Sequence, residues 1–295
     1  MPDRHSGQRE GIANMFTRRE VVNSSILAAG AITSAGPSAS AAPSRLKQSA
    51  SRWCYKDIEI GELCTFGAKI GLTGIDLLQP DEYDIPRRYG LRCSMGYVAD
   101  GPSITDGLNR LENHAAFEQA YRVGIPLAAK SGVPNVITFP GSRRGMSDAE
   151  GIKNTVAGLN RIKGIAEDHG VTVCLELLNS KIDHPDYMAD HTQWGVRVME
   201  EVNSPHVKLL FDIYHMQIME GDLIRTIRNN IKWIGHFHTA GVPDRHELND
   251  AQEVHWAGVA KAIADLNFTG YFAHEFVPVG APLPALEQAV RLCAV

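Results

Sequence analysis

The sequence lacks the features of several protein classes. Its five cysteines are widely spaced and form no CxxC pair, so free thiols are expected rather than a disulfide framework. The formal net charge is −5, which gives no basic footprint for nucleic acid. No apolar run approaches the ~20 residues of a membrane-spanning helix. With 295 residues, 44% of them hydrophobic, the chain can nevertheless bury a sizeable core.

Residues 1–50 differ in composition from the rest of the chain. Arg18 and Arg19 precede a mildly apolar stretch at 26–32, and a small-residue site follows at 39–41. This order resembles a twin-arginine export signal, so we expect segment 1–42 to be removed and the protein to be exported, in a bacterium to the periplasm. A disordered tail with a chance Arg-Arg pair, on a cytoplasmic protein, is the alternative. Met15 is an alternative start to Met1.

From residue 50 to residue 295, strand-like and helix-like segments alternate. Amphipathic helices are predicted at 148–169, 185–202, 223–230 and 255–266. Strands are predicted at 52–55, 74–78, 91–98, 135–140, 171–178, 207–213, 233–239 and 270–276. Eight such units favour a single-domain α/β fold, the closed (β/α)8 TIM barrel. An open doubly wound sheet is the alternative, but no GxGxxG turn follows the first strand.

Four of the predicted strands end in a residue that can ligate a metal. These residues are Glu176, Asp212, His238 and Glu275, and a parallel barrel would bring the strand ends together on one face. Burying each of these groups costs several kcal/mol unless it is paired or metal-bound. A mixed set of oxygen and nitrogen ligands favours Mn²⁺, Mg²⁺ or a comparable divalent ion. Four separately satisfied buried polar groups are the alternative.

Other polar residues follow the same strands. His215 lies just beyond the strand that ends at Asp212, and Arg245 lies in a loop made rigid by Pro243. Both are candidates for binding substrate oxygens, although a surface ion pair or a helix cap would explain either residue alone. For Trp53, core packing is favoured over a place in a pocket wall.

Several sequence segments resemble the hydroxypyruvate isomerase family of the xylose isomerase-like TIM-barrel superfamily. The resemblance runs from about residue 52 to the end and is carried by ELLNSKIDHPDYMADHTQWG, FDIYHMQIMEGDLIRTIRNN, HFHTAGVPDRHE and AHEFVP. It implies that Glu176 and Glu275 are the catalytic acid and base, and that Asp212 and His238 hold the metal with them. Some bacterial hydroxypyruvate isomerases have Gln at the position of His238. The His found here resembles metal-dependent ketose epimerases.

The resemblance implies an isomerase that moves a proton between adjacent carbons of a hydroxy-carbonyl substrate through an enediol. The expected partner is a small sugar or keto acid as substrate. The sequence neither predicts nor excludes a homo-oligomer. An exported sugar epimerase or keto-sugar enzyme on the same metal site is the second reading. A non-catalytic sugar-binding protein is the third. A DNA endonuclease on a related barrel is disfavoured by the negative charge.

The export signal makes a prediction that can be tested in the native host. If Arg18 and Arg19 direct export, the mature protein begins near residue 42, because cleavage would follow the small-residue site at 39–41. Mass spectrometry of the protein recovered from that host should give a correspondingly reduced mass. Recovery of a full-length cytoplasmic species alone would contradict the prediction.

Overall fold

Eight parallel strands form the centre of the protein. The computed structural model describes residues 44–295, so the predicted signal segment 1–42 lies outside the described residues. The strands are β1 (Lys47–Ser51), β2 (Gly74–Asp76), β3 (Arg92–Cys93), β4 (Asn135–Thr138), β5 (Thr172–Leu177), β6 (Val207–Asp212), β7 (Ile234–Thr239) and β8 (Tyr271–His274). Every strand pair is parallel, and the order is β3-β2-β1-β8-β7-β6-β5-β4.

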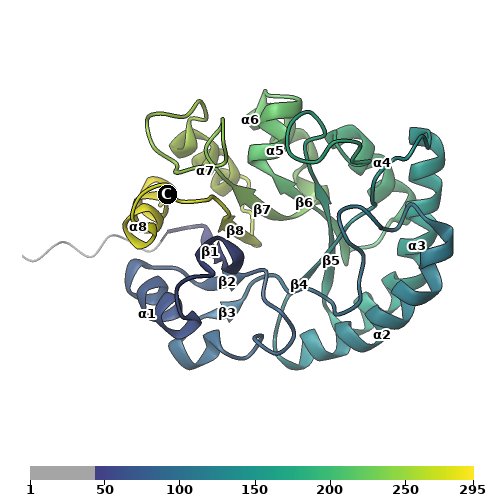
Figure 1. Cartoon of the computed structure of the whole chain (residues 1–295), viewed down its shortest axis with the longest axis horizontal. Coiled ribbons are helices and arrows are strands. Elements are labelled where there is room, and N and C mark those ends of the chain that lie inside the picture. Colours follow the sequence, from purple (N-terminus) through teal and green to yellow (C-terminus); the bar gives the residue numbers. More distant parts are fainter. Residues whose placement is uncertain (1–43) are drawn as a thin grey trace, which may run out of the picture. The chain divides into compact units, whose positions relative to one another are not determined.

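The sheet closes on itself through one residue. Gly96 follows β3 and forms a parallel bridge with Val136 of β4: its N–H donates to the Asn135 carbonyl at 2.9 Å, and its carbonyl accepts from Ile137 N at 3.1 Å. A Cβ atom at this position would lie 2.4 Å from a ring carbon of Tyr83, so only glycine fits. The predicted TIM barrel is therefore confirmed (Figure 1).

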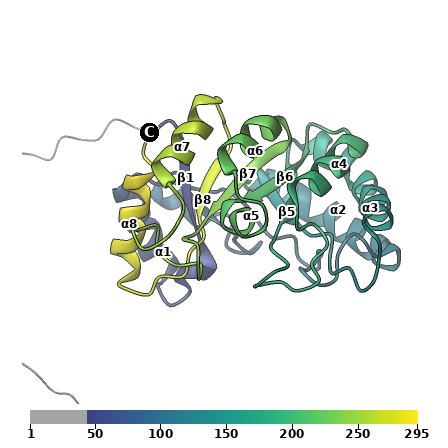
Figure 2. The same ribbon diagram turned by 90° about the horizontal axis from the view of Figure 1, so that it is seen from above.

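Helices surround the strands (Figures 1 and 2). They are α1 (Ile60–Ile70), α2 (His114–Lys130), α3 (Asp148–His169), α4 (Thr192–Val202), α5 (Ile213–Met219), α6 (Leu223–Asn230), α7 (Trp256–Asp265) and α8 (Pro282–Leu292). Sequence prediction gave the bounds of α3 and α6 correctly. In the described part of the chain, no helix is both long and apolar enough to cross a membrane.

The predicted first strand at 52–55 is wrong. Those residues form a short 3-10 helix, η1 (Arg52–Tyr55), and β1 lies just before it, starting three residues ahead of the predicted barrel boundary. The strand was missed because it is polar: Gln48, Ser49 and Ser51 are all buried. A search for apolar runs cannot find a strand whose inward side chains are serines.

Two further predictions need correction. Between β2 and β3 the chain forms a short 3-10 helix, η2 (Pro86–Tyr89), and no α-helix. Pro86 at the start of η2 and Gly90 after its end keep this helix short. The helix predicted at 185–202 begins at Thr192. The preceding segment is a loop, in which Asp190 accepts a hydrogen bond from Arg143 at 3.1 Å.

The register of the strands positions the carboxyl ends. Asp212 of β6 pairs with His238 of β7, which pairs with Ala273 of β8. Because side chains alternate between the two faces of a strand, Glu275 follows Ala273 on the same face of the sheet. The two inward groups of β6 and β7 therefore lie next to each other, with the Glu275 carboxylate beyond them.

Ser147 caps the N-terminus of α3, and its contribution to stability can be tested. The Ser147 side chain accepts a hydrogen bond from Glu150 N at 3.3 Å, so Ser147→Ala should lower the free energy of unfolding by about 1 kcal/mol. Ser147→Asp retains a good cap and is the control. Urea unfolding should show a lower midpoint for the alanine variant at an unchanged slope, and equal midpoints for Ser147→Ala and the wild type would count against the cap.

Candidate metal centre

The four predicted ligands converge on one buried point. Each offers one ligand atom, and the four atoms lie within 4.8 Å of one another. His238 Nδ1 lies 2.8 Å from Glu275 Oε2, 3.2 Å from Glu176 Oε1 and 4.0 Å from Asp212 Oδ2. All four side chains are buried. The prediction that these strand ends meet is confirmed, and we refer to the group as the carboxylate cluster.

The local backbone orients Asp212. This residue caps the N-terminus of α5, and its Oδ1 accepts hydrogen bonds from the backbone N–H groups of Tyr214 at 2.8 Å and His215 at 3.3 Å. Capping uses one carboxylate oxygen and leaves Oδ2 facing His238. The strand-to-helix turn thus directs one oxygen into the cluster.

Arg245 lies against the cluster, as the sequence suggested. Its Nη2 donates to Glu275 Oε2 at 2.6 Å and lies 3.6 Å from Asp212 Oδ2. The guanidinium carbon is 5.3 Å from the ring centre of Trp53 and 5.4 Å from that of Tyr214. Arg245 itself has a φ of 60°, a left-handed conformation that costs energy in a non-glycine residue. The loop is held there by Val277 N, which donates to the Arg245 carbonyl at 2.7 Å.

Burial and the neighbouring charges together move the pKa values in the cluster apart. Burial raises the pKa of Asp212 to about 7, against the attraction of Arg245. Burial also raises the pKa of Glu176. For Glu275, His238 and Arg245 outweigh burial and hold the pKa well below its usual range. Burial would lower the pKa of His238, but the neighbouring carboxylates raise it well above the usual value. Without a metal, His238 is therefore a cation at neutral pH.

His215 also lies where the sequence placed it, beside Asp212. Its Nε2 is 3.6 Å from Asp212 Oδ2, and its Nδ1 accepts a hydrogen bond from Asn179 Nδ2 at 2.6 Å. Because Nδ1 is an acceptor, the neutral ring carries its proton on Nε2. Burial keeps the pKa of His215 well below its usual value, so the ring is neutral. It can donate one hydrogen bond toward the cluster.

Sequence reasoning missed the role of Trp53. Its Nε1 donates to Glu275 Oε1 at 2.6 Å, although the side chain is 39% exposed. Both oxygens of Glu275 are thereby fixed, one by Trp53 and the other by Arg245 and His238. No spacing rule could have found this contact, because 222 residues separate the two partners.

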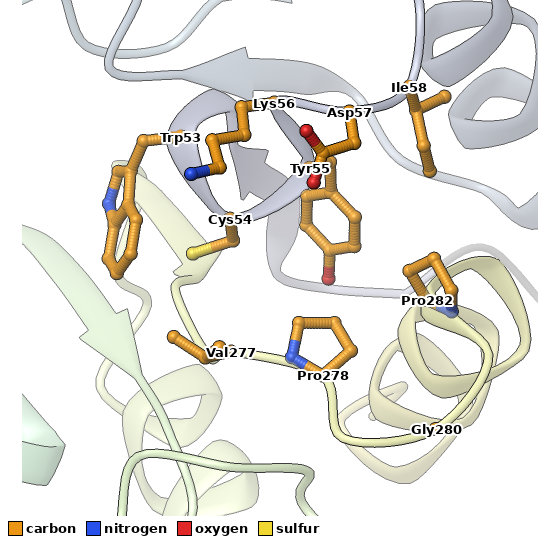
Figure 3. A pocket seen from close by; sticks show the side chains of 10 residues that line it. All are labelled: Trp53, Cys54, Tyr55, Lys56, Asp57, Ile58, Val277, Pro278, Gly280 and Pro282. Atoms are coloured by element: carbon orange, nitrogen blue, oxygen red, sulfur yellow. The ribbon is translucent and has the colours of Figure 1, made fainter.

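A hollow of about 300 Å³ adjoins Trp53. It lies between η1 and the segment after β8, and Figure 3 shows the Cys54 sulfur and the Tyr55 ring directed toward Val277 and Pro278. Trp53 borders the hollow and also binds Glu275, but none of the four proposed ligands lines the hollow.

A second polar group lies inside the barrel. Asp76, His236 and His238 also offer ligand atoms within 4.8 Å of one another, and all three side chains are buried. Burial would raise the pKa of Asp76, but His236 and His238 outweigh it, so the pKa is lower than usual. Asp76 ends β2 in the structure but lies in the middle of the strand predicted at 74–78, so the sequence prediction did not mark it as a carboxylate at a strand end.

The comparison with protein families decides the classification. The model for the xylose isomerase-like TIM barrel matches residues 87–293, well over half of the chain. The chain belongs to this family. The predicted superfamily is therefore confirmed.

Curated relatives of the chain are isomerases and epimerases by name. A Danio rerio protein named for hydroxypyruvate isomerase is 30% identical over 45% of this chain and 48% of its own length. A 2-oxo-tetronate isomerase from Cupriavidus necator is 35% identical over 38% of this chain and 43% of its own. A D-psicose 3-epimerase from Agrobacterium fabrum is 30% identical over 43% of each chain. The matches thus span about half the length of these relatives.

Solved structures share the fold at low sequence identity. A Brucella melitensis protein described as an AP endonuclease of family 2 has a TM-score of 0.73 and 22% identity, covering 82% of this chain and 96% of its own. A protein named IolI, solved with a zinc atom, has a TM-score of 0.66 and 15% identity, covering 84% and 95%. These two structures therefore share the whole barrel fold with this chain.

Proton competition at the cluster gives a prediction. A metal at this position must displace the Nδ1 proton of His238 and, below about pH 7, the proton of Asp212 as well. Affinity for Mn²⁺ should therefore fall as the pH falls, by about tenfold per pH unit for each displaced proton, and more steeply below pH 7.

Calorimetric Mn²⁺ titrations in two buffers of different ionisation enthalpy would count the released protons. Circular dichroism at each pH controls for unfolding. Equal affinity at mildly acidic and mildly alkaline pH, with no proton release, would refute this linkage.

Proposed function

We propose that this protein is a metal-dependent isomerase acting on a small sugar or keto acid with adjacent hydroxyl and carbonyl groups. The observation that carries the proposal is the carboxylate cluster, in which three carboxylates and one imidazole share a buried space. The relatives named for hydroxypyruvate and 2-oxo-tetronate isomerase support the reaction class.

The cluster fits a divalent metal ion. Its donors are three carboxylates and a histidine, a set that suits Mn²⁺ or Mg²⁺. His238 Nδ1 is buried and has no hydrogen-bond partner of good geometry among the described residues. We propose Glu176, Asp212, His238 and Glu275 as the ligands. A bound ion would supply Lewis-acid stabilisation of negative charge on the substrate oxygens.

Glu176 and Glu275 are proposed as the acid and base. One removes the proton from the carbon next to the carbonyl, and the other returns a proton to the neighbouring carbon of the enediolate. Their pKa values shift in opposite directions, which is the condition for an acid and a base to coexist at one pH. Trp53 and Arg245 hold the Glu275 carboxylate from both sides.

His215 and Arg245 are proposed to bind the substrate. Arg245 is cationic and can contact a carboxylate or enediolate oxygen, while neutral His215 can donate from Nε2 to a hydroxyl oxygen. Burial would lower the pKa of Arg245, but Glu275 and Asp212 raise it, so its charge persists.

A sugar epimerase is the second candidate function. A relative is named D-psicose 3-epimerase, and epimerisation also removes and returns a proton next to a carbonyl. Turnover assays of the Mn²⁺-loaded protein with hydroxypyruvate, tetronates and ketohexoses would separate the two. A sugar that binds without turnover in every assay would favour a binding protein.

Metal content tests the ligand assignment. Asp212→Ala removes one proposed ligand and should lose most of the bound Mn²⁺ in elemental analysis of purified protein. Asp265→Ala is the control, because this aspartate pairs with Arg45 on the surface. Equal metal content in Asp212→Ala and the wild type would remove Asp212 from the site.

Solvent deuterium tests the acid and base. Glu176→Gln and Glu275→Gln should each slow its incorporation next to the substrate carbonyl by at least ~10²–10⁴-fold, the usual contribution of general acid–base catalysis. Glu118→Gln, a half-buried residue of α2 that pairs with Arg122 and Arg161 and has no part in the proposed site, is the control. Saturating Mn²⁺ and measured occupancy are required, because both glutamates are also proposed ligands. If a glutamine variant with full Mn²⁺ occupancy exchanges the proton at the wild-type rate, the substituted glutamate is not the acid or base. His215 would then be the next candidate.

A further inference from the structure

One buried carboxylate has no part in the proposed reaction. Asp76 lies at the end of β2 and contacts His238 on the side of the ring opposite to Glu176 and Glu275. Its Oδ2 is 2.9 Å from His238 Nε2, and its Oδ1 accepts from Ser94 Oγ at 2.5 Å and lies 3.2 Å from His236 Nε2. In the sheet, β1 and β8 separate β2 from β7. The contact between Asp76 and His238 therefore crosses the inside of the barrel.

The two nitrogens of His238 thus face different surroundings. Nε2 faces one carboxylate, Asp76, while Nδ1 faces Glu176 and Glu275. A neutral imidazole carries one proton, and only its bare nitrogen can ligate a metal. A carboxylate that accepts from Nε2–H keeps the proton on that nitrogen and leaves Nδ1 bare.

We infer that Asp76 is a positioning residue that fixes the ring orientation and the tautomer of His238, so that Nδ1 faces a divalent metal ion in the carboxylate cluster. The inference rests on the proposed metal site. Ser94 in turn restrains Asp76, which completes a chain of hydrogen bonds from the end of β3 to His238. Partners of this kind behind a metal-binding histidine change metal affinity by about 10–100-fold.

The same three residues allow a competing arrangement. Asp76, His236 and His238 could hold a second metal ion, because their ligand atoms also lie within 4.8 Å of one another. His238 would then use both nitrogens as ligands and carry no proton. The 2.9 Å separation of Nε2 and Oδ2 is an ordinary hydrogen-bond length. We therefore expect one metal ion per chain.

Metal affinity tests the role of Asp76. In Mn²⁺ titrations of the full chain, Asp76→Asn should bind about 10–100-fold more weakly than the wild type, because the amide cannot hold the Nε2 proton as a carboxylate does. Gln48→Met is the matched control: Gln48 Oε1 accepts from His274 Nε2 at 2.8 Å, so this variant also removes a buried histidine contact inside the sheet. It should lose stability but keep its Mn²⁺ affinity.

A separate comparison distinguishes failure of this inference from failure of the metal site. If Asp212→Ala loses Mn²⁺ while Asp76→Asn binds as tightly as the wild type, only the role of Asp76 is overturned. If the wild type binds no divalent ion, the metal site itself is overturned. Two Mn²⁺ ions per chain would replace the positioning role with a second metal position.

A measurement on the wild type avoids dependence on the folding of a variant. In Mg²⁺-loaded protein labelled with ¹⁵N-histidine, His238 should show a protonated Nε2 and a Nδ1 without a proton. The opposite pattern, with the proton on Nδ1, would overturn the inference whatever the stability of Asp76→Asn.

Discussion

Repulsion among three buried carboxylates is the constraint on which the active end of this barrel depends. Glu176, Asp212 and Glu275 share one space that water hardly reaches, and ionised carboxylates in such surroundings cost several kcal/mol each unless they are compensated. The compensation in the chain itself comes from Arg245 and from the imidazolium of His238. Two positive charges against three carboxylates leave one negative charge, and this excess adds to burial, the larger cause, in raising the pKa of Asp212.

The same imbalance explains why a cation suits the site. A divalent ion would take the place of the His238 Nδ1 proton and allow Asp212 to ionise. The surrounding polar groups orient the donors in advance: Trp53 and Arg245 hold Glu275, and the cap of α5 holds Asp212. A site whose donors are already oriented loses little conformational entropy when it binds.

The barrel interior below the site is polar as well, and this property shapes the fold. Ser49 and Ser51 of β1 and Asp76 of β2 are buried, as are the two histidines of β7. A polar layer of this kind places a carboxylate behind His238, which apolar packing could not do. Because its inward residues are polar, the sequence of β1 contains no run of hydrophobic residues.

The sequence by itself determined the alternation of strands and helices, the bounds of α3 and α6, and the four strand ends that carry Glu176, Asp212, His238 and Glu275. These features are local: apolar periodicity, a capping serine before α3 and a glycine after it, and a ligand-type residue at the end of four of the strands. Parallel topology then brings the strand ends to one face, which is why the convergence could be predicted.

Only the tertiary structure decided the rest. β1 could not be found because its inward residues are serines in a polar layer, and the roles of Trp53 and Asp76 depend on contacts across 222 and 162 residues of sequence. Such contacts follow from strand order and from the directions of side chains across the barrel, neither of which any local pattern contains. The separation of pKa values within the carboxylate cluster has the same origin, since it arises from burial and from the distances between charges.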